Sequence, residues 1–580
     1  MQQFGHSRTS WLAIILLGAM ALFVLRLFQL QVLQYGTYTK LAQASQQRKF
    51  SLPAERGKIY MTDGQEIAPV VLNQTVYSVI ADPQAVDNHE RQHIIASLRE
   101  IAGGEMVQDA DKRLYNKKSR YEILAKNISR TQAEKLKKKN FAGILYQQGS
   151  VRNYPEGGLG AHVLGFVNAS GEGQYGVEGA LEKRLKGQDG LLRSVTDVRN
   201  VPLTVGKGNI RIEPKAGENI ALTIDRNVQD FTEEALKKGI LASRATEGSA
   251  LVMNPNNGHI LAVANYPTYN PVDYAKQTDA SVFMNSAMMA PFEPGSIIKS
   301  FSFATAIDKG AITPAAVYNN TDCITVADRT MCNVLRGLGG PMTIQGAFNN
   351  SLNVGTITAI RKLGDGSHIN LAARRALYEY YHDRFGFGQK TGVELSEADG
   401  YVYLPDSAEG NEVRYSAMTY GQSMNLTMIQ VAAGFSSLVN GGQYYRPTIL
   451  KGSVNSDGVV TATKTTSLRQ AVSATTSSQM RNMLTTARLS SFLSKDDKPG
   501  YEVGGKTGTA EAVIHGKYSQ DETIATYIGY GGRDAAEYVI MVRVAAPGRG
   551  VSLQGNYHAG PIFTDISNWM IDYMKLAPKG

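Results

Sequence analysis

The strongest hydrophobic pattern is an uncharged run from Trp11 to Leu25, which continues beyond Arg26 to Leu33. This stretch satisfies the roughly 20 residues that a helix needs to cross a bilayer. No small-residue cleavage site closes the run, so an uncleaved anchor is favoured over a signal peptide. The positive charges on its two sides do not decide the orientation. We expect a short tail at 1–10 and a membrane anchor at 11–33.

The next segment, 34–220, has no single dominant period. Helical patterns occupy 87–103 and 129–140, and the second has a Ser-x-x-Gln capping box at Ser129. Glycines then separate short elements between 152 and 190. We expect one elongated, loop-rich module over this segment.

From residue 221 the pattern changes to that of a larger domain. A strand at 220–224 precedes an amphipathic helix that ends at Gly239, and two β-rich runs at 248–254 and 259–265 are joined by a Pro-Asn-Asn-Gly turn. A second hairpin pattern lies at 523–546, before a final helix with an apolar stripe. Strands at both ends and a mostly helical middle predict an α+β fold with an antiparallel sheet.

Composition narrows the class of protein. A chain of 580 residues is too long for one core, and its 43% hydrophobic and 19% charged residues are typical of globular domains. The net charge of +9 is modest, and no nucleic-acid-binding module accompanies it. Only two cysteines are present, which excludes a four-cysteine zinc site or an iron–sulfur cluster supplied by this chain alone.

A candidate nucleophile lies in the sequence Glu-Pro-Gly-Ser-Ile-Ile-Lys, which contains Ser296 and Lys299. On a helix these two residues share a face. Apolar neighbours lower the pKa of a lysine, and a neutral amine can accept the proton of a serine hydroxyl. Spacing alone is equally compatible with an ordinary surface helix.

Two further motifs follow in the same domain. Ser351 and Asn353 form a Ser-x-Asn motif, and Lys506, Thr507 and Gly508 form a Lys-Thr-Gly motif that continues into Thr509. Ser-x-x-Lys, Ser-x-Asn and Lys-Thr-Gly, in this order, are the signature of penicillin-binding proteins and class A β-lactamases. Each motif alone is weak, but three in order indicate one active site.

Each motif has a chemical role in this hypothesis. The serine of the first motif acts as nucleophile at a helix amino terminus, and its lysine acts as base. Ser351 relays a proton, and the Asn353 amide holds a substrate carbonyl. Lys506, Thr507 and Thr509 bind a terminal carboxylate, and the glycines let a peptide approach the strand edge. Backbone N–H groups of the nucleophile and Thr509 form an oxyanion hole.

The whole chain resembles the class B penicillin-binding proteins. Beyond the three motifs, the similarity is carried by further segments at 54–64, 152–167, 176–182, 222–229, 385–395 and 419–442. The resemblance implies a membrane helix, a pedestal or dimerisation domain at 34–220, and a transpeptidase domain of the serine β-lactamase-like fold at 221–580. That domain would have an antiparallel sheet and a helical subdomain.

The resemblance also implies a function. It predicts a D,D-transpeptidase without a cofactor that cross-links peptidoglycan stem peptides, from a D-Ala-D-Ala donor, through an acyl-Ser296 ester. Such an enzyme binds β-lactams covalently, faces outward from the cell membrane and does not act on nucleic acid. The short pedestal resembles FtsI-type septal enzymes, and class B relatives imply a SEDS-family polymerase and other divisome proteins as partners. The alternatives are an elongation-type transpeptidase, a non-catalytic β-lactam receptor or scaffold, and a β-lactamase.

Two other patterns have competing interpretations. His89 and His93 form a His-Glu-x-x-His sequence that on a helix would suit zinc. A helix cap by Asp87 with Glu90 as its reciprocal partner is favoured instead, because no convincing third ligand follows. Cys323 and Cys332 either clip a small hairpin as a disulfide or remain reduced thiols.

Overall fold

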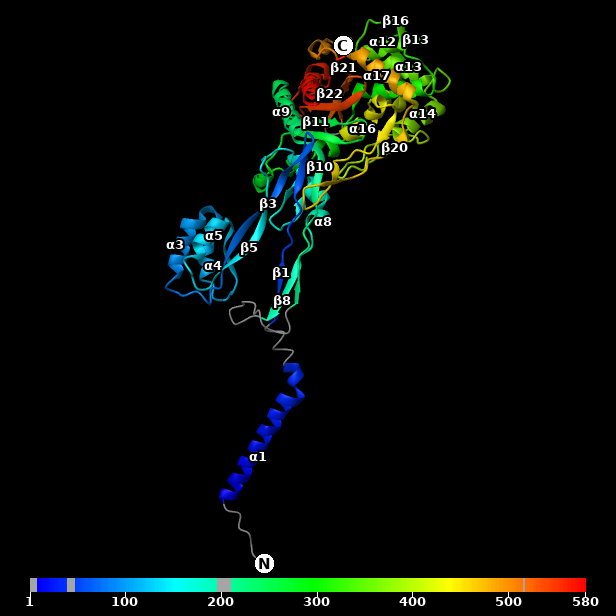
Figure 1. Ribbon diagram of the computed structural model, residues 1–580. Helices are drawn as coiled ribbons and strands as arrows, with labels where there is room; N and C mark the ends of the chain where they lie inside the picture. The colour runs from blue at the N-terminus through cyan, green and yellow to red at the C-terminus, as the bar shows by residue number, and fades with distance from the viewer. Residues whose placement is uncertain (1–7, 39–46, 196–209, 515–516, 580) are drawn as a thin grey trace, which may run out of the picture. The chain divides into compact units, whose positions relative to one another are not determined.

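The computed structural model describes residues 8–38, 47–195, 210–514 and 517–579 (Figure 1). At the amino terminus, α1 (Arg8–Phe28) runs directly into η1 (Gln29–Leu33). Together they form a helix of 26 residues that is long and apolar enough to cross a membrane. Most of its apolar side chains are exposed.

The chain separates into two compact units. One comprises residues up to Arg56 together with 186–217, and the other comprises 57–185 and 218–580. Besides the membrane-length helix, the first unit contains a three-stranded antiparallel sheet in the order β1-β8-β9. Its strands are β1 (Gln47–Leu52), β8 (Gly190–Val195) and β9 (Ile210–Ile212).

The second unit has a seven-stranded sheet that joins early and late segments of the chain. Its strands are β2 (Ile59–Asp63), β3 (Glu66–Ala81), β4 (Glu122–Ile128), β5 (Ile144–Asn153), β10 (Asn219–Asp225), β18 (Leu450–Val454) and β19 (Val460–Ala462). The predicted strand at 220–224 is confirmed as β10, but it pairs with β2 and β18 in this sheet. It therefore does not extend the sheet built by the two later hairpins.

A small helical lobe packs on β3, β4 and β5. It contains α3 (Arg91–Ala102), α4 (Ala110–Leu114) and α5 (Arg130–Lys137). The capping box of α5 is confirmed, because the Ser129 side chain accepts from the Gln132 N–H and the Gln132 side chain accepts from the Ser129 N–H.

The predicted cap of α3 is wrong. Asp87 accepts from the backbone N–H of His89, which forms a turn before the helix, and Glu90 occupies the N-cap without a side-chain cap bond. Because the helix begins only at Arg91, His89 lies outside it. The two histidines therefore do not share one helix face, and the geometry behind the zinc interpretation is not formed.

The second sheet of this unit confirms the predicted architecture. It has five antiparallel strands in the order β12-β11-β23-β22-β21, drawn from both ends of the predicted domain. The strands are β11 (Glu247–Met253), β12 (Ile260–Tyr266), β21 (Glu502–Ile514), β22 (Lys517–Gly532) and β23 (Ala536–Ala545). The strand with the Lys-Thr-Gly motif, β21, lies at one edge of this sheet.

One face of the five-stranded sheet is covered by α9 (Arg226–Ala242) and α18 (Gly560–Tyr573), which share a hydrophobic cluster with it. The apolar stripe predicted for the final helix is confirmed in α18. The predicted end of α9 at Gly239 is wrong, because the helix continues through this residue. A Cβ atom at Gly239 would lie 2.3 Å from Cγ1 of Ile562. The glycine therefore permits close packing of the two helices and does not end one.

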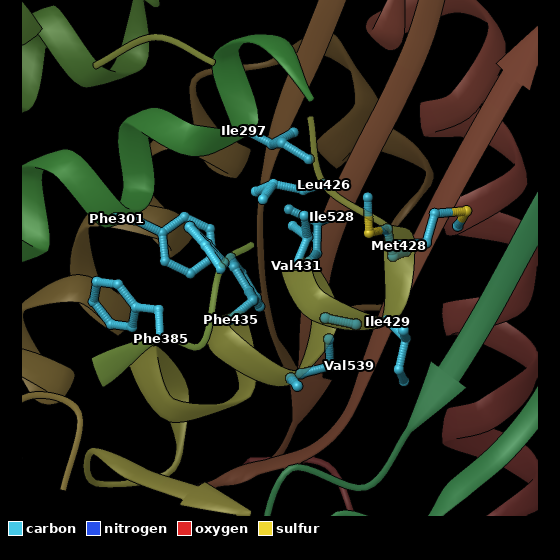
Figure 2. Close-up of a cluster of buried hydrophobic side chains, with 14 of the residues drawn as sticks. Ile297, Phe301, Phe385, Leu426, Met428, Ile429, Val431, Phe435, Ile528 and Val539 are labelled. Atoms are coloured by element: carbon cyan, nitrogen blue, oxygen red, sulfur yellow. The ribbon is translucent and has the colours of Figure 1, made fainter. Parts of the chain in front are cut away.

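The other face carries the hydrophobic core of the site (Figure 2). Every residue of α16 (Met428–Val439) is buried between the sheet and the continuous helix formed by η5 (Gly295–Ile298) and α11 (Lys299–Asp308). Ile297 and Phe301 of that helix point toward Leu426, Val431 and Phe435 (Figure 2). This packing fixes the first turn of the helix relative to the sheet.

The remaining elements are short and belong mostly to the helical middle of the chain. The helices are α6 (Ala161–Leu164), α7 (Gly176–Ala180), α8 (Glu182–Leu185), α10 (Ser286–Met289), α12 (Ile344–Asn349), α13 (Asn353–Arg361), α14 (Leu371–Tyr378), α15 (Glu412–Met418) and α17 (Ala474–Leu489). Single helical turns are η2 (Gly103–Glu105), η3 (Pro271–Lys276), η4 (Ala280–Phe283), η6 (Glu379–Arg384), η7 (Phe492–Asp496) and η8 (Gly555–Ala559). Two-stranded ladders are formed by β6 (Phe166–Val167) with β7 (Gly173–Gln174), β13 (Val317–Asn320) with β16 (Gly340–Thr343), β14 (Cys323–Val326) with β15 (Arg329–Cys332), and β17 (Gln443–Tyr445) with β20 (Ser467–Gln470).

Candidate active site

The candidate nucleophile, Ser296, lies in the first turn of the η5–α11 helix. The preceding Gly295 has a φ of +66°, and a Cβ atom there would lie 2.8 Å from the carbonyl oxygen and 3.3 Å from the nitrogen of Thr509. A Cβ at Gly421 would lie 2.1 Å from the Gly295 carbonyl oxygen. The helix start is thus held closely between β21 and the 419–426 segment, which only glycines permit.

Lys299 follows one helical turn after Ser296 and is fully buried. Its Nζ donates to the backbone oxygen of Ser351 at 2.5 Å and to the Ser351 Oγ at 3.2 Å. A neutral amine has two N–H groups, so these bonds leave its lone pair free. Among the described residues, no partner binds the Ser296 hydroxyl. The residue spacing places this free hydroxyl on the same helix side as the amine.

Ser351 lies in the turn between α12 and α13 and has a φ of +54°, a left-handed conformation that is rare for serine. This conformation directs both its carbonyl oxygen and its hydroxyl toward Lys299. Lys506 Nζ also donates to the Ser351 Oγ, at 3.0 Å. A hydroxyl can accept two hydrogen bonds and donate one. With both lysines donating, the Ser351 O–H remains available to give a proton to a third group.

The two lysines have lowered pKa values. Burial is the main cause at Lys299, and the neighbouring charge of Lys506 adds to it, so the pKa of Lys299 lies well below its usual range. Burial lowers the pKa of Lys506 to about 7. Because two ammonium groups around one hydroxyl repel each other, the favoured state has one proton fewer. We assign the neutral amine to Lys299, where both causes act together.

Asn353 begins α13, and its side-chain amide donates to the backbone oxygen of Cys332 at 2.8 Å. Cys323 and Cys332 face each other across β14 and β15 and are joined by a disulfide. Asn333, directly after β15, accepts from the backbone N–H of Val354 at 2.9 Å. The Ser-x-Asn turn and the disulfide hairpin therefore support each other, and one N–H of the Asn353 amide remains for a ligand.

The strand side of the site depends on Gly508. A Cβ at this position would lie 2.2 Å from Thr526 Oγ1 and 2.8 Å from the Pro294 carbonyl oxygen. Its absence lets the helix start and β21 touch. Thr507 is partly exposed, Thr509 is exposed, and Thr509 Oγ1 accepts from the Gly555 N–H at 3.3 Å. Since side chains alternate along a strand, both threonines point away from the side occupied by Lys506 and Gly508.

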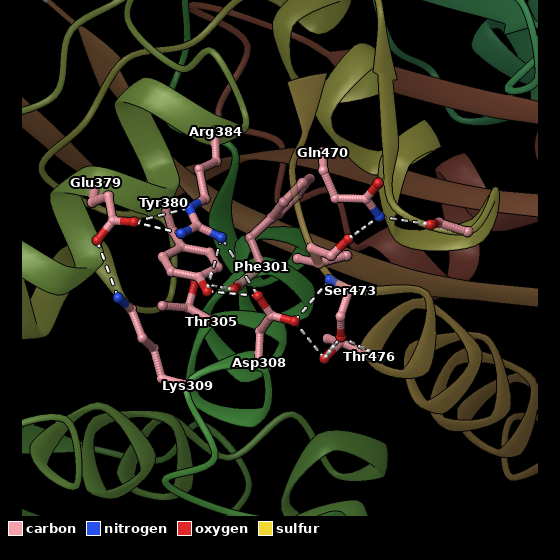
Figure 3. Close-up of polar contacts among 12 residues, drawn as sticks. Phe301, Thr305, Asp308, Lys309, Glu379, Tyr380, Arg384, Gln470, Ser473 and Thr476 are labelled. Carbon is pink, nitrogen blue, oxygen red and sulfur yellow. Dashed lines mark hydrogen bonds and ion pairs between the residues drawn. The ribbon is translucent and has the colours of Figure 1, made fainter. Parts of the chain in front are cut away.

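The far end of α11 is anchored by a polar network (Figure 3). Asp308 accepts from the Ser473 N–H at 2.8 Å, Thr476 Oγ1 at 2.7 Å and the Tyr380 hydroxyl at 2.6 Å. Arg384 lies over the Tyr380 ring and 3.6 Å from Asp308. The helix that carries Ser296 and Lys299 is therefore held at both ends.

The structure brings four of the sequence-predicted groups into one place: Ser296, Lys299, Ser351 and Lys506. Three contributions were missed in the sequence: the Gly295–Gly421 contact, the Ser351 carbonyl as a partner of Lys299, and Glu293, whose carboxyl accepts from the Ser423 N–H. The Pro-Gly pair before the nucleophile was the available signal for the first of these. The other two depend on long-range contacts that have no local pattern.

Comparisons with known proteins identify the domain families in this chain. The penicillin binding protein transpeptidase domain matches residues 248–568, and the penicillin-binding protein dimerisation domain matches residues 51–222. Stage V sporulation protein D of Bacillus subtilis is 28% identical over 99% of this chain and 87% of its own length. A probable peptidoglycan D,D-transpeptidase, PbpC of Pseudomonas aeruginosa, is 26% identical over 95% of this chain and 93% of its own.

The fold is also similar to that of solved penicillin binding proteins. Penicillin binding protein 2X from Streptococcus thermophilus superposes with a TM-score of 0.74 at 23% identity, covering 91% of this chain and 80% of that one. The transpeptidase model alone spans more than half of the present chain, and the dimerisation model precedes it in the order expected for class B. The chain therefore belongs to the class B penicillin-binding proteins, as a member with both a dimerisation domain and a transpeptidase domain.

Proposed function

We propose that this chain is a peptidoglycan D,D-transpeptidase that acts through an acyl ester on Ser296. The observation that carries the proposal is the pair of buried lysines that share the Ser351 hydroxyl beside the first turn of α11. A neutral Lys299 next to a helix-terminal serine meets the requirements of a nucleophile and its base. In this proposal 34–220 is the pedestal and 221–580 the catalytic domain.

Acylation follows from these positions. Ser296 Oγ attacks the carbonyl carbon of the penultimate D-Ala while Lys299 accepts the hydroxyl proton. The developing oxyanion lies between the N–H groups of Ser296 and Thr509, whose segments Gly295 brings into contact. The Ser351 hydroxyl passes a proton to the departing D-Ala amine and is replenished from Lys299. The C–N bond breaks, and the stem peptide remains as an ester on Ser296.

Binding uses the strand side of the site. The hydroxyls of Thr507 and Thr509 bind the terminal carboxylate of the donor, and the Lys506 ammonium attracts it from the other side of β21. The peptide backbone of the donor adds to the free edge of this strand. The remaining N–H of the Asn353 side chain donates to a substrate carbonyl. In the second half-reaction an amine from a neighbouring stem attacks the ester carbonyl carbon and gives its proton to Lys299. The C–O bond to Ser296 Oγ then breaks, and Lys299 returns the proton to Ser296 Oγ.

A labelling experiment tests the proposal. Full-length protein in detergent is treated with a fluorescent penicillin, and the labelled peptide is mapped by mass spectrometry. We expect one adduct on Ser296, none in a folded Ser296→Ala variant, and transfer of a D-Ala-D-Ala donor to an added amine. Labelling of folded Ser296→Ala would refute the nucleophile assignment. Labelling without peptide turnover would indicate a β-lactam receptor, and rapid release of hydrolysed penicillin would indicate a β-lactamase.

The cellular setting of the enzyme is part of the same proposal. The apolar helix Arg8–Leu33 supports a single membrane anchor, with the catalytic domain on the outer side where peptidoglycan is built. The resemblance to FtsI-type enzymes supports a septal role beside a SEDS-family polymerase and other divisome proteins. Purified protein given lipid-linked precursor should polymerise no glycan by itself. Crosslinking through α1 in cells should recover a polymerase. Glycan made by this chain alone would contradict the proposal that a partner polymerises glycan and this chain only cross-links it.

A further inference from the structure

A separate cavity lies near the nucleophile turn, beside the carboxyl-terminal part of β21 (the acidic cavity). Its volume is about 200 Å³. One wall of the cavity is formed by the sheet. It includes Glu511 of β21, Glu522 of β22 and Arg543 of β23. Phe292 and Glu293 form another part of the wall, and Glu293 is only three residues before Ser296. The acidic cavity therefore lies next to the active site along the direction of β21.

The charges around this cavity are strongly unbalanced. Four carboxylates line it, from Glu247, Glu293, Glu511 and Glu522, against the single guanidinium of Arg543. Arg543 pairs with Glu247 at 3.0 Å. Within the described ranges no salt bridge reaches the other three carboxylates, although Glu522 accepts from two backbone N–H groups at 2.6 and 2.9 Å. A positively charged ligand would restore the balance.

Glu293 supplies an independent indication of a missing partner. This residue is only 8% exposed. Its Oε1 accepts from the Ser423 N–H at 2.9 Å and the Tyr518 hydroxyl at 2.6 Å. Its Oε2 is buried without a partner. A buried carboxylate oxygen without a donor costs free energy, and its burial raises the pKa of Glu293. A group that brings N–H donors and a positive charge would remove both penalties.

The proposed path of the donor leads to this cavity. Its terminal carboxylate lies at Lys506 and its scissile carbonyl at Thr509, so strand addition carries the preceding residues of the stem toward Glu511. Thr509 and Glu511 are two positions apart, a distance of roughly 7 Å along a strand. A side chain of the residue before the D-Ala-D-Ala unit comes within reach of the acidic cavity.

We propose that the acidic cavity binds a primary ammonium group on the side chain of the donor stem peptide, upstream of the D-Ala-D-Ala unit. This inference rests on the proposed function, because it takes the direction of the donor from the roles of Lys506 and Thr509. The cavity would make the enzyme selective for stems that carry a free amine. Glu293 and Glu511 supply the carboxylates that recognise it.

A pair of donors that differ in one acetyl group provides the test. Nα-acetyl-L-Lys-D-Ala-D-lactate has a free ε-ammonium, and its Nε-acetylated counterpart does not. With full-length protein and a fixed acceptor, we expect kcat/KM to be about tenfold or more higher for the free amine. Glu511→Gln, at an exposed position, should bring this ratio toward one, and Glu293→Gln should do the same if it folds. Glu537→Gln, on β23 outside the cavity, should keep the wild-type ratio.

The outcomes distinguish a donor amine from an acceptor amine. They also distinguish failure of this inference from failure of the proposed function. A wild-type ratio near one, or a ratio unchanged in Glu511→Gln, would overturn the inference. If the variants alter only the KM of acceptors that carry a second ammonium, the cavity serves the acceptor and the donor assignment is wrong. Benzylpenicillin has no amine, so its adduct on Ser296 reports the proposed function independently. Without that adduct in the wild type, the proposed function and this inference fall together.

Discussion

The two walls of the active site differ in how they are built. On the helix wall, every residue from Lys299 to Ile307 is buried, and the core of Figure 2 and the network of Figure 3 fix its two ends. On the strand wall, β21 is an edge strand in which Thr509 and Glu511 are exposed. The helix wall holds reacting groups in a low-dielectric setting, whereas the strand wall leaves backbone and side-chain groups free for a ligand.

The difference also separates the two lysines. Lys299 belongs to the helix wall, where burial and a neighbouring charge both favour its neutral form. Lys506 extends from the strand wall to the same hydroxyl and has a pKa of about 7, so it can be charged or neutral near physiological pH. We infer that proton transfer depends on the helix wall and carboxylate binding on the strand wall.

The largest effect is expected for Lys299→Ala, which removes the base. Acylation by benzylpenicillin should slow by about 10²–10⁴-fold, because the Ser296 proton then has no positioned acceptor. Stopped-flow labelling measures the rate, and near-ultraviolet circular dichroism checks the fold. The methyl ester of benzylpenicillin should suffer an equal loss, since the base does not contact the ligand carboxylate. A folded variant that acylates at the wild-type rate would contradict the role of the helix wall.

The next effect concerns the contact between the walls. In Gly508→Ala the new Cβ would lie 2.8 Å from the Pro294 carbonyl oxygen, so the helix start and β21 must separate. We expect acylation to slow by about 10–100-fold, because sub-ångström displacement of a nucleophile is costly. Gly149→Ala is the matched control, since its Cβ would meet only a side-chain atom at 4.0 Å. Equal rates in both variants would show that the walls tolerate separation.

A smaller and selective effect is expected for Lys506→Ala. Losing the ammonium should reduce acylation by benzylpenicillin by about 10-fold and affect its methyl ester much less. Equal losses on both ligands would contradict the proposed division of roles.

The pH dependence sharpens this prediction. The ammonium of Lys506 is present below its pKa of about 7 and is lost as the pH rises through that value. The kcat/KM for the carboxylate ligand should therefore fall on the alkaline side of pH 7. With the methyl ester this decline should be absent, and an identical decline for both ligands would place the titration elsewhere.

The strand wall was more predictable from the sequence than the helix wall. β-rich runs indicated both hairpins, the first with a Pro-Asn-Asn-Gly turn, and glycines around Lys506 indicated a strand edge that a peptide can approach closely. On the helix wall, the motif predicted that Lys299 lies near Ser296, but not that the carbonyl of Ser351 holds its amine. That contact joins residues 52 positions apart through a left-handed turn, which no local period encodes. The helix end predicted at Gly239 was wrong for the same reason, because the residue that this glycine packs against, Ile562, is remote in sequence.

The smallest effect is expected for the disulfide hairpin, which supports the helix wall from outside. Replacing Cys323 and Cys332 with serine removes a link across nine residues, and we expect a loss of about 2–3 kcal/mol in the stability of this region. The side chains of Asn353 and Asn333 still tie the hairpin to α13 through hydrogen bonds to the backbone, so acylation should slow less than about threefold. A non-reduced digest of wild-type protein from an oxidising compartment should contain the linked peptides, and free thiols at both positions would reject the bridge. A large loss of acylation rate in the folded double variant would instead show that the helix wall needs the disulfide to position its reacting groups.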